Sequence, residues 1–264
     1  MKTIYAGLPF YSASTKQDYH RVNSKIPFYT PTTNLPSFIV CDDIAEVPET
    51  IDIYLAPIDD PESVDTNITA AIGASIISMT DDFYIVYDGS TISPSLAKGV
   101  YFLRIDTSTG NSYYSEIFAV VDMTSGVWCK IECSNTNDLG NILYATGGFE
   151  SVYYLNTQLG YPATETIEVG EEKDGEFIAE KLVTKHLYRI STYVSRALQR
   201  CLSRLPQHDS ITITDDVDDT YTPAVGNVQM TYEWPSFDVC HIVIQFGDGE
   251  NTAFKWTYDM TDIT

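Results

Sequence analysis

The chain has 264 residues, 44% hydrophobic and 12% aromatic, which is enough for a substantial core and argues against intrinsic disorder. Its 19 Tyr, with many Thr, Ile and Val residues, favour strands over helices. The 15 Lys and Arg against 37 Asp and Glu give a formal charge of −22, which repels phosphates and disfavours sequence-specific nucleic-acid binding.

The cysteines indicate a reducing compartment. Their odd number and unpaired spacing argue against a disulfide framework; they are Cys41, Cys129, Cys133, Cys201 and Cys240. The opening MKTIYAGLPFYSAST has no continuous apolar stretch before a cleavage site, so we expect no secretory signal. No run of about 18 apolar residues occurs, so we expect no membrane span.

Residues 1–36 mix Ser, Thr, Asn and Pro with scattered aromatic residues and have little helical periodicity. We expect an extended N-terminal arm here. Such an arm lies either on its own domain or on a neighbouring molecule, and the sequence favours neither.

Between residues 37 and 122, strand-like runs alternate with turn-forming residues. The runs are SFIVC (37–41), IDIYLA (51–56), ASIISM (74–79), FYIVYDG (83–89), VYFLRID (100–106) and YYSEIFAVV (113–121). Such spacing is typical of an immunoglobulin-like β-sandwich, here residues 37–122. The last two runs predict a hairpin in which Tyr101, Leu103 and Ile105 share a buried face.

After a boundary at 123–126, residues 127–264 predict a second β-rich domain. Its strand-like runs are VWCKIEC (127–133), ILYA (142–145), SVYYL (151–155), ETIEV (165–169), ITIT (211–214), VQMTYEW (228–234), VCHIVIQF (239–246) and TAFKWTY (252–258). An acidic loop, GEEKDGE, is expected at 170–176. The predicted fold is therefore mostly β, with tandem β-sandwich modules and one amphipathic helix in the C-terminal half.

That helix is predicted over residues 191–205. Its apolar positions recur at three- and four-residue spacing; they are Val194, Leu198, Cys201, Leu202 and Leu205. Ser191 or Thr192 is expected to cap its start, and Pro206 lies just beyond its end.

The sequence offers no motif for catalysis. No Gly-x-Ser-x-Gly elbow occurs. Cys129 and Cys133 would lie about 13 Å apart on one strand, too far for a disulfide or a shared zinc ion. His208 is expected at the helix end or on the surface. We expect no enzyme, metal or cofactor. The DDVDD run at 215–219 predicts a solvated hairpin loop, and calcium binding there stays open.

One charged segment is unusual. Residues 181–208 contain six cations and no acid. Arg196, Arg200 and Arg204 recur every four residues and form one stripe on the predicted helix. The stripe is either a solvated face or a positive patch that docks on the acidic surface of an adjacent copy, a contact that builds rings. We take Arg196, Arg200, Arg204, Lys185 and Arg189 as the candidate interface.

Two blocks carry a resemblance. GVYFLRIDTSTGNSYYSEIFAVVD resembles a hairpin common in structural proteins of tailed phages that infect Bacteroides-type gut bacteria, crAss-like phages among them. GEEKDGEFIAEKLVTKHLYRI, VSRALQRCLSRLPQHDSITI and the later TYEW resemble the C-terminal half of the same kind of protein.

The resemblance implies a virion component of the tail or neck, assembled in the host cytoplasm as a ring or adaptor around the DNA conduit. Its partners would be other tail or neck proteins and copies of itself. The alternative is a carbohydrate- or receptor-binding β-sandwich at a tail tip or on a fibre. Both expectations exclude a membrane and a sequence-specific nucleic-acid partner.

Overall fold

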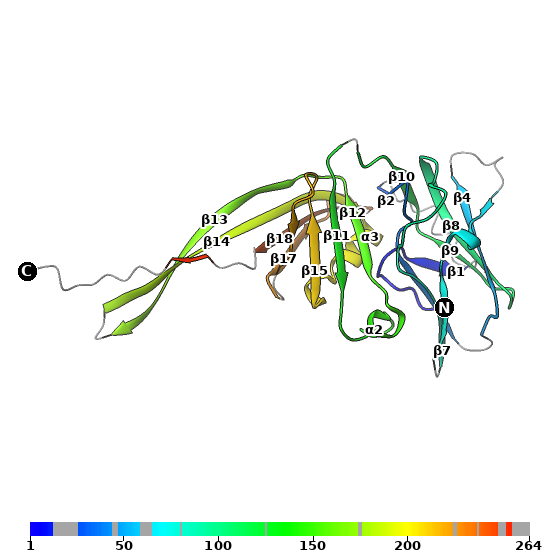
Figure 1. Ribbon diagram of the computed structural model, residues 1–264, viewed down its shortest axis with the longest axis horizontal. Coiled ribbons are helices and arrows are strands. Elements are labelled where there is room, and N and C mark those ends of the chain that lie inside the picture. Colours follow the sequence, from blue (N-terminus) through cyan, green and yellow to red (C-terminus); the bar gives the residue numbers. More distant parts are fainter. Residues whose placement is uncertain are drawn as a thin grey trace, which may run out of the picture.

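The structure is a computed structural model of the chain. It describes residues 1–12, 26–43, 47–58, 65–79, 81–124, 126–173, 176–223, 226–236, 238–247 and 252–254. At 161, 164–173, 176–185 and 252–254 only the backbone is described. The fold is mostly β, as predicted, and its strands form three sheets (Figure 1).

The largest sheet has eleven strands. Its main path, in spatial order, is β1 (Phe10–Ser12), β9 (Ser112–Ser115), β8 (Gly99–Thr107), β10 (Phe118–Val121), β2 (Phe28–Pro31), β12 (Ser151–Leu155), β11 (Cys129–Ser134), β15 (Ser210–Thr214) and β16 (Thr220–Tyr221). Off this path, β4 (Ile51–Pro57) pairs with β8 and with β5 (Thr66–Asn67).

The predicted hairpin at 100–121 is confirmed, but its second strand is interrupted. Strands β9 and β10 both pair with β8, separated by Glu116 and Ile117. The Ser115 hydroxyl fills the gap in the ladder, because it accepts the Leu103 N–H (2.8 Å) and donates to the Glu116 carbonyl (2.7 Å). Leu103 and Ile105 are fully buried, as their spacing predicted.

The N-terminal arm is part of the main sheet. Strand β1 pairs with β9, and β2 pairs with β10 on one side and β12 on the other. Leu8, Phe10 and Phe28 are buried in the core. The sequence left open whether this arm lies on its own domain or on a neighbouring molecule. Residues 1–12 and 26–36 pack on their own chain, and residues 13–25 lie outside the described residues. In the described part, the apolar residues of this segment fill the core.

Gly7 allows this close packing. Its φ is +66°, and an added Cβ would lie 2.1 Å from the Ser37 carbonyl oxygen. That oxygen accepts the N–H of Leu8 at 2.6 Å. A side chain at position 7 would therefore push the N-terminal segment off the sheet.

The predicted boundary at 123–126 lies between two strands of one sheet. Strands β10 and β11 are connected laterally through β2 and β12. One cluster of buried residues includes Val40 and Phe83 from the first predicted domain with Ile190 and Ile244 from the second. The division into units 37–122 and 127–264, and their tandem sandwich arrangement, stay predictions.

A three-stranded sheet of β3 (Phe38–Asp43), β7 (Asp82–Tyr87) and β6 (Ser75–Ser78) completes the N-terminal half. The strand predicted at 142–145 is wrong. This segment leads into a single helical turn, α2 (Tyr144–Gly147). The Asp138 carboxylate accepts the N–H groups of Ala145 and Thr146 and so caps the turn, and Gly148 ends it at φ +61°.

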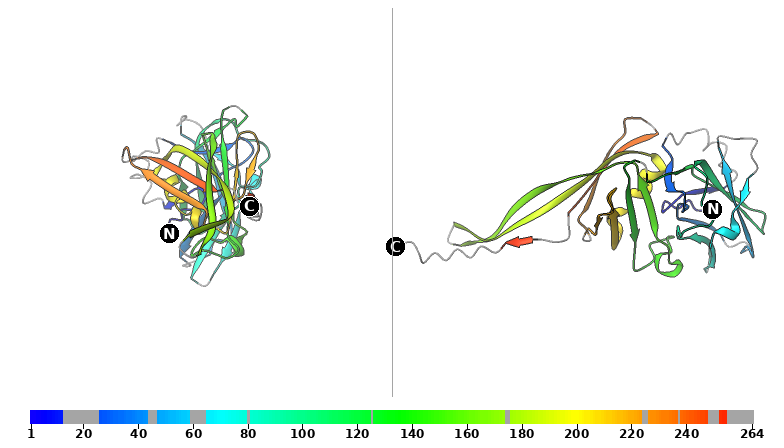
Figure 2. Two further views of the ribbon diagram at one scale, coloured as in Figure 1. Left: turned by 90° about the vertical axis from the view of Figure 1, so that its left-hand side faces the viewer. Right: turned by 45° about the horizontal axis from the view of Figure 1, so that its top comes forward.

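The third sheet contains the two longest strands. Its order is β13 (Leu159–Lys173), β14 (Glu176–Ser195), β18 (Val239–Gly247) and β17 (Val228–Glu233), with β19 (Thr252–Phe254) also paired to β14. The acidic loop predicted at 170–176 is wrong in extent, since residues 170–173 and 176 continue the two strands. The hairpin of β13 and β14 projects from the body of the molecule, as Figure 1 and the right-hand view of Figure 2 show.

The helix predicted at 191–205 is shorter than expected. Residues 191–195 complete β14, and α3 spans Arg196–Leu202, followed by the 3₁₀ turn η2 (Leu205–Gln207). Ser195, rather than Ser191 or Thr192, caps α3, because its hydroxyl accepts the Leu198 N–H at 3.2 Å. The apolar stripe of Leu198, Cys201 and Leu202 is buried as predicted.

Leu198→Asp is expected to lower the free energy of unfolding by several kcal/mol, because an unpaired carboxylate would replace an apolar side chain that is 2% exposed. Urea unfolding of the two proteins measures the difference. Gln207→Asp, at an exposed position just after the helix, is the matched control and is expected to cost little. Wild-type stability in Leu198→Asp would contradict the packing described here.

Candidate assembly interface

The stripe of Arg196, Arg200 and Arg204, termed here the arginine face, lies on the outer side of α3 and the turn after it. Arg196 and Arg200 are exposed, and Arg204 is partly exposed. The opposite side of the helix carries the buried apolar stripe. The four-residue spacing places Arg196 and Arg200 on one side of α3, and Arg204 follows in the turn after the helix.

Two of these arginines lie over aromatic rings. The Arg200 guanidinium is 5.0 Å from the centre of the Tyr5 ring, and its Nη1 donates to the Tyr5 hydroxyl at 2.5 Å. The Arg196 guanidinium is 6.0 Å from the Trp234 ring, which is 43% exposed. Such cation–π contacts contribute about 0.5–1 kcal/mol at exposed sites. They hold the two guanidinium groups in place on the surface of the helix.

The positive charge of this surface is available to a partner. Within the described part of the chain, Arg200 and Arg204 form no ion pair with a carboxylate. Arginine, tyrosine and tryptophan are also the residue types that dominate the energetics of protein interfaces. The sequence reasoning missed Tyr5 and Trp234, because no local pattern connects residues that lie so far from α3 in the chain.

The other two candidate residues lie apart from the arginine face. Arg189 is an exposed residue of β14 and is paired with Gly160 and Gln245. Lys185 also belongs to β14, where only its backbone is described, opposite Glu165. At a rise of about 3.3 Å per residue, Lys185 is about 33 Å from the end of the strand. The predicted set therefore divides into the arginine face and two positions along the hairpin.

The hairpin is a second candidate surface. Pairing of β14 with β18 ends at Leu187 and Gly247. Residues 164–173 and 176–186, termed the distal hairpin, extend farther, and of this part only 182–184 gain a third strand, β19. Residues 176–186 span about 35 Å at the strand rise. Figure 1 shows this part well away from the rest of the body.

The distal hairpin is acidic. From residue 164 to residue 180 the chain carries seven acidic residues and one lysine. An isolated two-stranded hairpin is at best marginally stable in water. Contact with another surface, preferably a positively charged one, would stabilise the distal hairpin.

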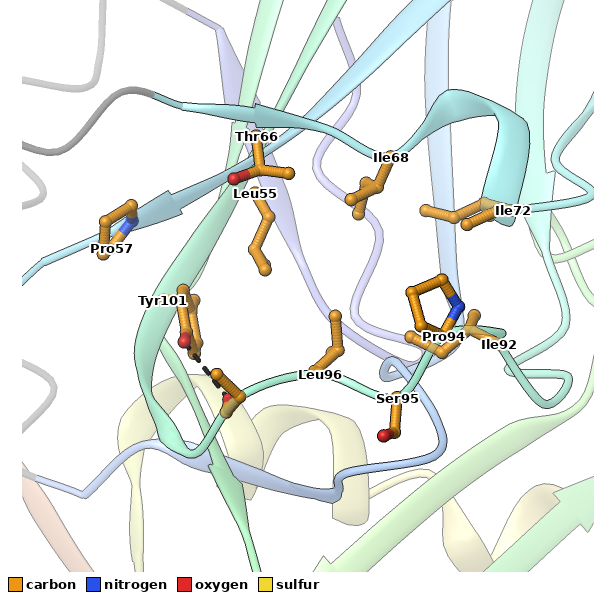
Figure 3. A pocket seen from close by; sticks show the side chains of 12 residues that line it. Leu55, Pro57, Thr66, Ile68, Ile72, Ile92, Pro94, Ser95, Leu96 and Tyr101 are labelled. Carbon is orange, nitrogen blue, oxygen red and sulfur yellow. Dashed lines mark hydrogen bonds between the residues drawn. The ribbon is translucent and has the colours of Figure 1, made fainter.

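An apolar pocket of about 450 Å³ lies between β4, the segment 66–72 and the loop 92–97 (Figure 3). Leu55, Ile68, Ile72 and Leu96 point into it. The Tyr101 hydroxyl donates a hydrogen bond to the Ala97 carbonyl at 3.1 Å. The described lining contains no carboxylate, imidazole or thiol. This pocket can hold an apolar group, but its lining supplies few of the hydrogen bonds that a sugar requires.

The cysteines are buried, free thiols. Burial raises the pKa of each, to about 12 for Cys129, so all five stay protonated at neutral pH. Cys129 and Cys133 lie at opposite ends of β11. Where side chains are described, no three His, Cys, Asp or Glu residues come together as metal ligands.

His208 closes the end of the helical segment, as its position predicted. Its Nδ1 lies 2.9 Å from the Arg204 carbonyl oxygen, and its Nε2 contacts the Tyr144 hydroxyl. A neutral ring that donates from Nδ1 and accepts at Nε2 satisfies both contacts. The ring is 4% exposed, so it is buried rather than on the surface, and this burial lowers the pKa of His208 below its usual value.

The acidic run at 215–219 forms the turn between β15 and β16. Its first residue, Asp215, accepts the N–H groups of Val217 (3.0 Å) and Asp219 (2.9 Å). Asp218 adopts φ +65°, which aspartate tolerates in turns. These hydrogen bonds close the loop of the β15–β16 hairpin, as the sequence predicted for this run.

Comparison of the chain with protein families, curated proteins and solved structures found no significant match. None of the helices described combines the length and the hydropathy that a membrane crossing requires.

His208→Gln is expected to flatten the pH dependence of stability. A folded-state pKa below the unfolded value of about 6.5 means that the unfolded chain binds the proton first, so wild-type stability falls as pH drops below that value. The variant loses the buried contacts of His208, and it also loses the decrease in stability that protonation of this buried ring causes at low pH. Urea unfolding at pH 8 and pH 5.5 should show a smaller gap between the two proteins at the lower pH. An equal gap at both values would contradict a lowered pKa.

Chelator and reductant are expected to leave the melting temperature unchanged, because the described thiols are free, protonated and buried. Calorimetry with EDTA and, separately, with dithiothreitol measures this. A drop of several degrees in either case would reveal a metal or a disulfide that holds the fold.

Proposed function

We propose that this protein is a non-enzymatic structural component of a bacteriophage tail or neck, which assembles as a ring or adaptor around the DNA conduit. Its partners are copies of itself and other tail or neck proteins, and its place is the virion, assembled in the host cytoplasm. The observation that carries the proposal is the projecting hairpin of β13 and β14.

A hairpin of this length needs a reason. Residues 187–195 of β14 are held by β18, whereas the distal hairpin gains little from its own body. The cost of ordering each backbone residue is about 1–2 kcal/mol, and two strands alone do not recover it in water. In an assembly, a neighbouring subunit supplies the missing surface. Extended elements that reach over a neighbour are therefore natural parts of a ring or a tube.

The arginine face supports the same role. The guanidinium groups of the exposed Arg196 and Arg200 lie over Trp234 and Tyr5, a combination suited to protein–protein contact. The formal charge of −22 suits a conduit through which DNA must slide without binding. The sequence resemblance to phage structural proteins, in both the β8–β10 hairpin and the β13–α3 segment, supplies the biological setting.

A second candidate is a carbohydrate- or receptor-binding module of a tail tip or fibre. It is favoured by Tyr232 and Trp234, two aromatic residues of the β17 segment that are 53% and 43% exposed. Aromatic rings at alternate positions can stack on sugars. Titration with host glycans, followed by tryptophan fluorescence and compared with Trp234→Ala, would identify this function.

Replacing Arg196, Arg200 and Arg204 by Glu is expected to leave the fold intact and to abolish incorporation into particles. The change reverses the charge of the arginine face and leaves the buried stripe of α3 untouched. Circular dichroism tests the fold, and the protein content of particles made with the variant in place of wild type tests incorporation. The triple Arg→Lys variant keeps the charge and should still be incorporated. A triple Glu variant found in particles at wild-type levels would refute a role for this face.

A further inference from the structure

The hairpin and the helix after it form one continuous element with opposite charges at its two ends. Residues 164–180 carry seven acids and one lysine. Residues 181–208 carry six cations and no acid. The acidic end is the distal hairpin, in which Lys181 and Lys185 also lie, opposite Val169 and Glu165. The basic end is the arginine face.

These two ends cannot meet within one molecule. Residue 176 and residue 195 are the two ends of β14, about 60 Å apart at the strand rise. The strand is paired with β13 along most of its length, which prevents it from folding back. Figure 1 shows the tip of the hairpin and α3 separated by the length of that strand. Any contact between the acidic end and the basic end therefore joins two copies.

We propose that the acidic distal hairpin of one copy docks on the arginine face of the next copy, a contact that rests on the proposed function and specifies its self-association. Carboxylates and guanidinium groups form paired, charge-assisted hydrogen bonds, which fix geometry as well as attraction. The docked hairpin gains the surface that its own body does not provide. The arginine face gains the carboxylates that the described residues do not supply to Arg200 and Arg204.

The contact is heterologous, because it joins two different surfaces of the same protein. Each copy therefore offers one hairpin and one arginine face, and repetition gives a ring when the rotation between copies closes. The remaining acidic surfaces of the two copies repel each other, so the head-to-tail orientation is the one that brings opposite charges together. The attraction also weakens with salt, since exposed charges are screened over about 10 Å at 0.1 M.

Two complementary variants test the contact. The face variant carries Arg196→Glu, Arg200→Glu and Arg204→Glu. The hairpin variant carries Glu168→Lys, Glu171→Lys and Glu172→Lys. Each alone places like charges against each other at the contact, so each should lose self-association by about tenfold or more. Mixed in equal amounts, the two restore opposite charges at every contact, and alternating assemblies should form.

Native mass spectrometry and light scattering, over a series of protein and salt concentrations, provide the measurement. Circular dichroism confirms that both variants fold. The matched control replaces the same three glutamates by Gln, which removes the attraction without adding positive charge and should not rescue the face variant. Assembly of the mixture, but of neither variant alone, is the expected result.

Three outcomes would overturn the proposed contact: a wild-type protein that stays monomeric throughout, a hairpin variant that associates as well as wild type, or a mixture that does not assemble. The function is judged separately by incorporation of the face variant into particles. If that variant is excluded from particles and the mixture does not assemble, the arginine face binds another tail protein. The function then stands and the contact between copies falls.

Discussion

The twenty residues of β14 experience two different physical constraints, and much of the C-terminal half depends on them. In residues 187–195 the strand pairs with β18, and as far as Ile190 also with β13, and its side chains Ile190 and Val194 enter the core. Toward its start the strand has β13 and, briefly, β19 as neighbours. One element is thus a core strand at one end and a projection at the other. The arginine face follows immediately after the core end, which ties its position to the most firmly held part of the strand.

Sequence reasoning found the elements whose burial leaves a pattern. The period-two alternation of β8 and β18 and the apolar stripe of Leu198, Cys201 and Leu202 correspond to buried faces. The start of α3 was misplaced because Val194 fits both periods: it lies on the helical stripe and on the inward face of β14. The decisive signal is local, since Ser195 caps the helix through the Leu198 N–H. Ser195 can be recognised as the cap from the sequence only when β14 is known to extend as far as that residue.

Other features left no local signal. The distal hairpin pairs mainly with itself, and its charged residues 170–176 were interpreted as a loop. Helical turn α2 depends on Asp138, which lies outside the turn and caps it from a distance. The N-terminal arm enters the main sheet through β2, which pairs with β10, 90 residues farther along the chain, and with β12, 125 residues farther along. The aromatic rings beneath the arginines come likewise from remote segments. Tertiary contact, rather than local propensity, decides each of these cases.

The distribution of charge would allow a protein of formal charge −22 to form the proposed contact between its own copies. Uniformly spread, such a charge would keep copies apart. Here six of the 15 cations lie within residues 181–208, and seven of the 37 acids lie within residues 164–180. Under the proposed contact, attraction would be concentrated in one element, the hairpin of β13 and β14 with the helix that follows it. The separation of charge would then specify the geometry of the assembly, because it requires the hairpin of one copy to meet the arginine face of another.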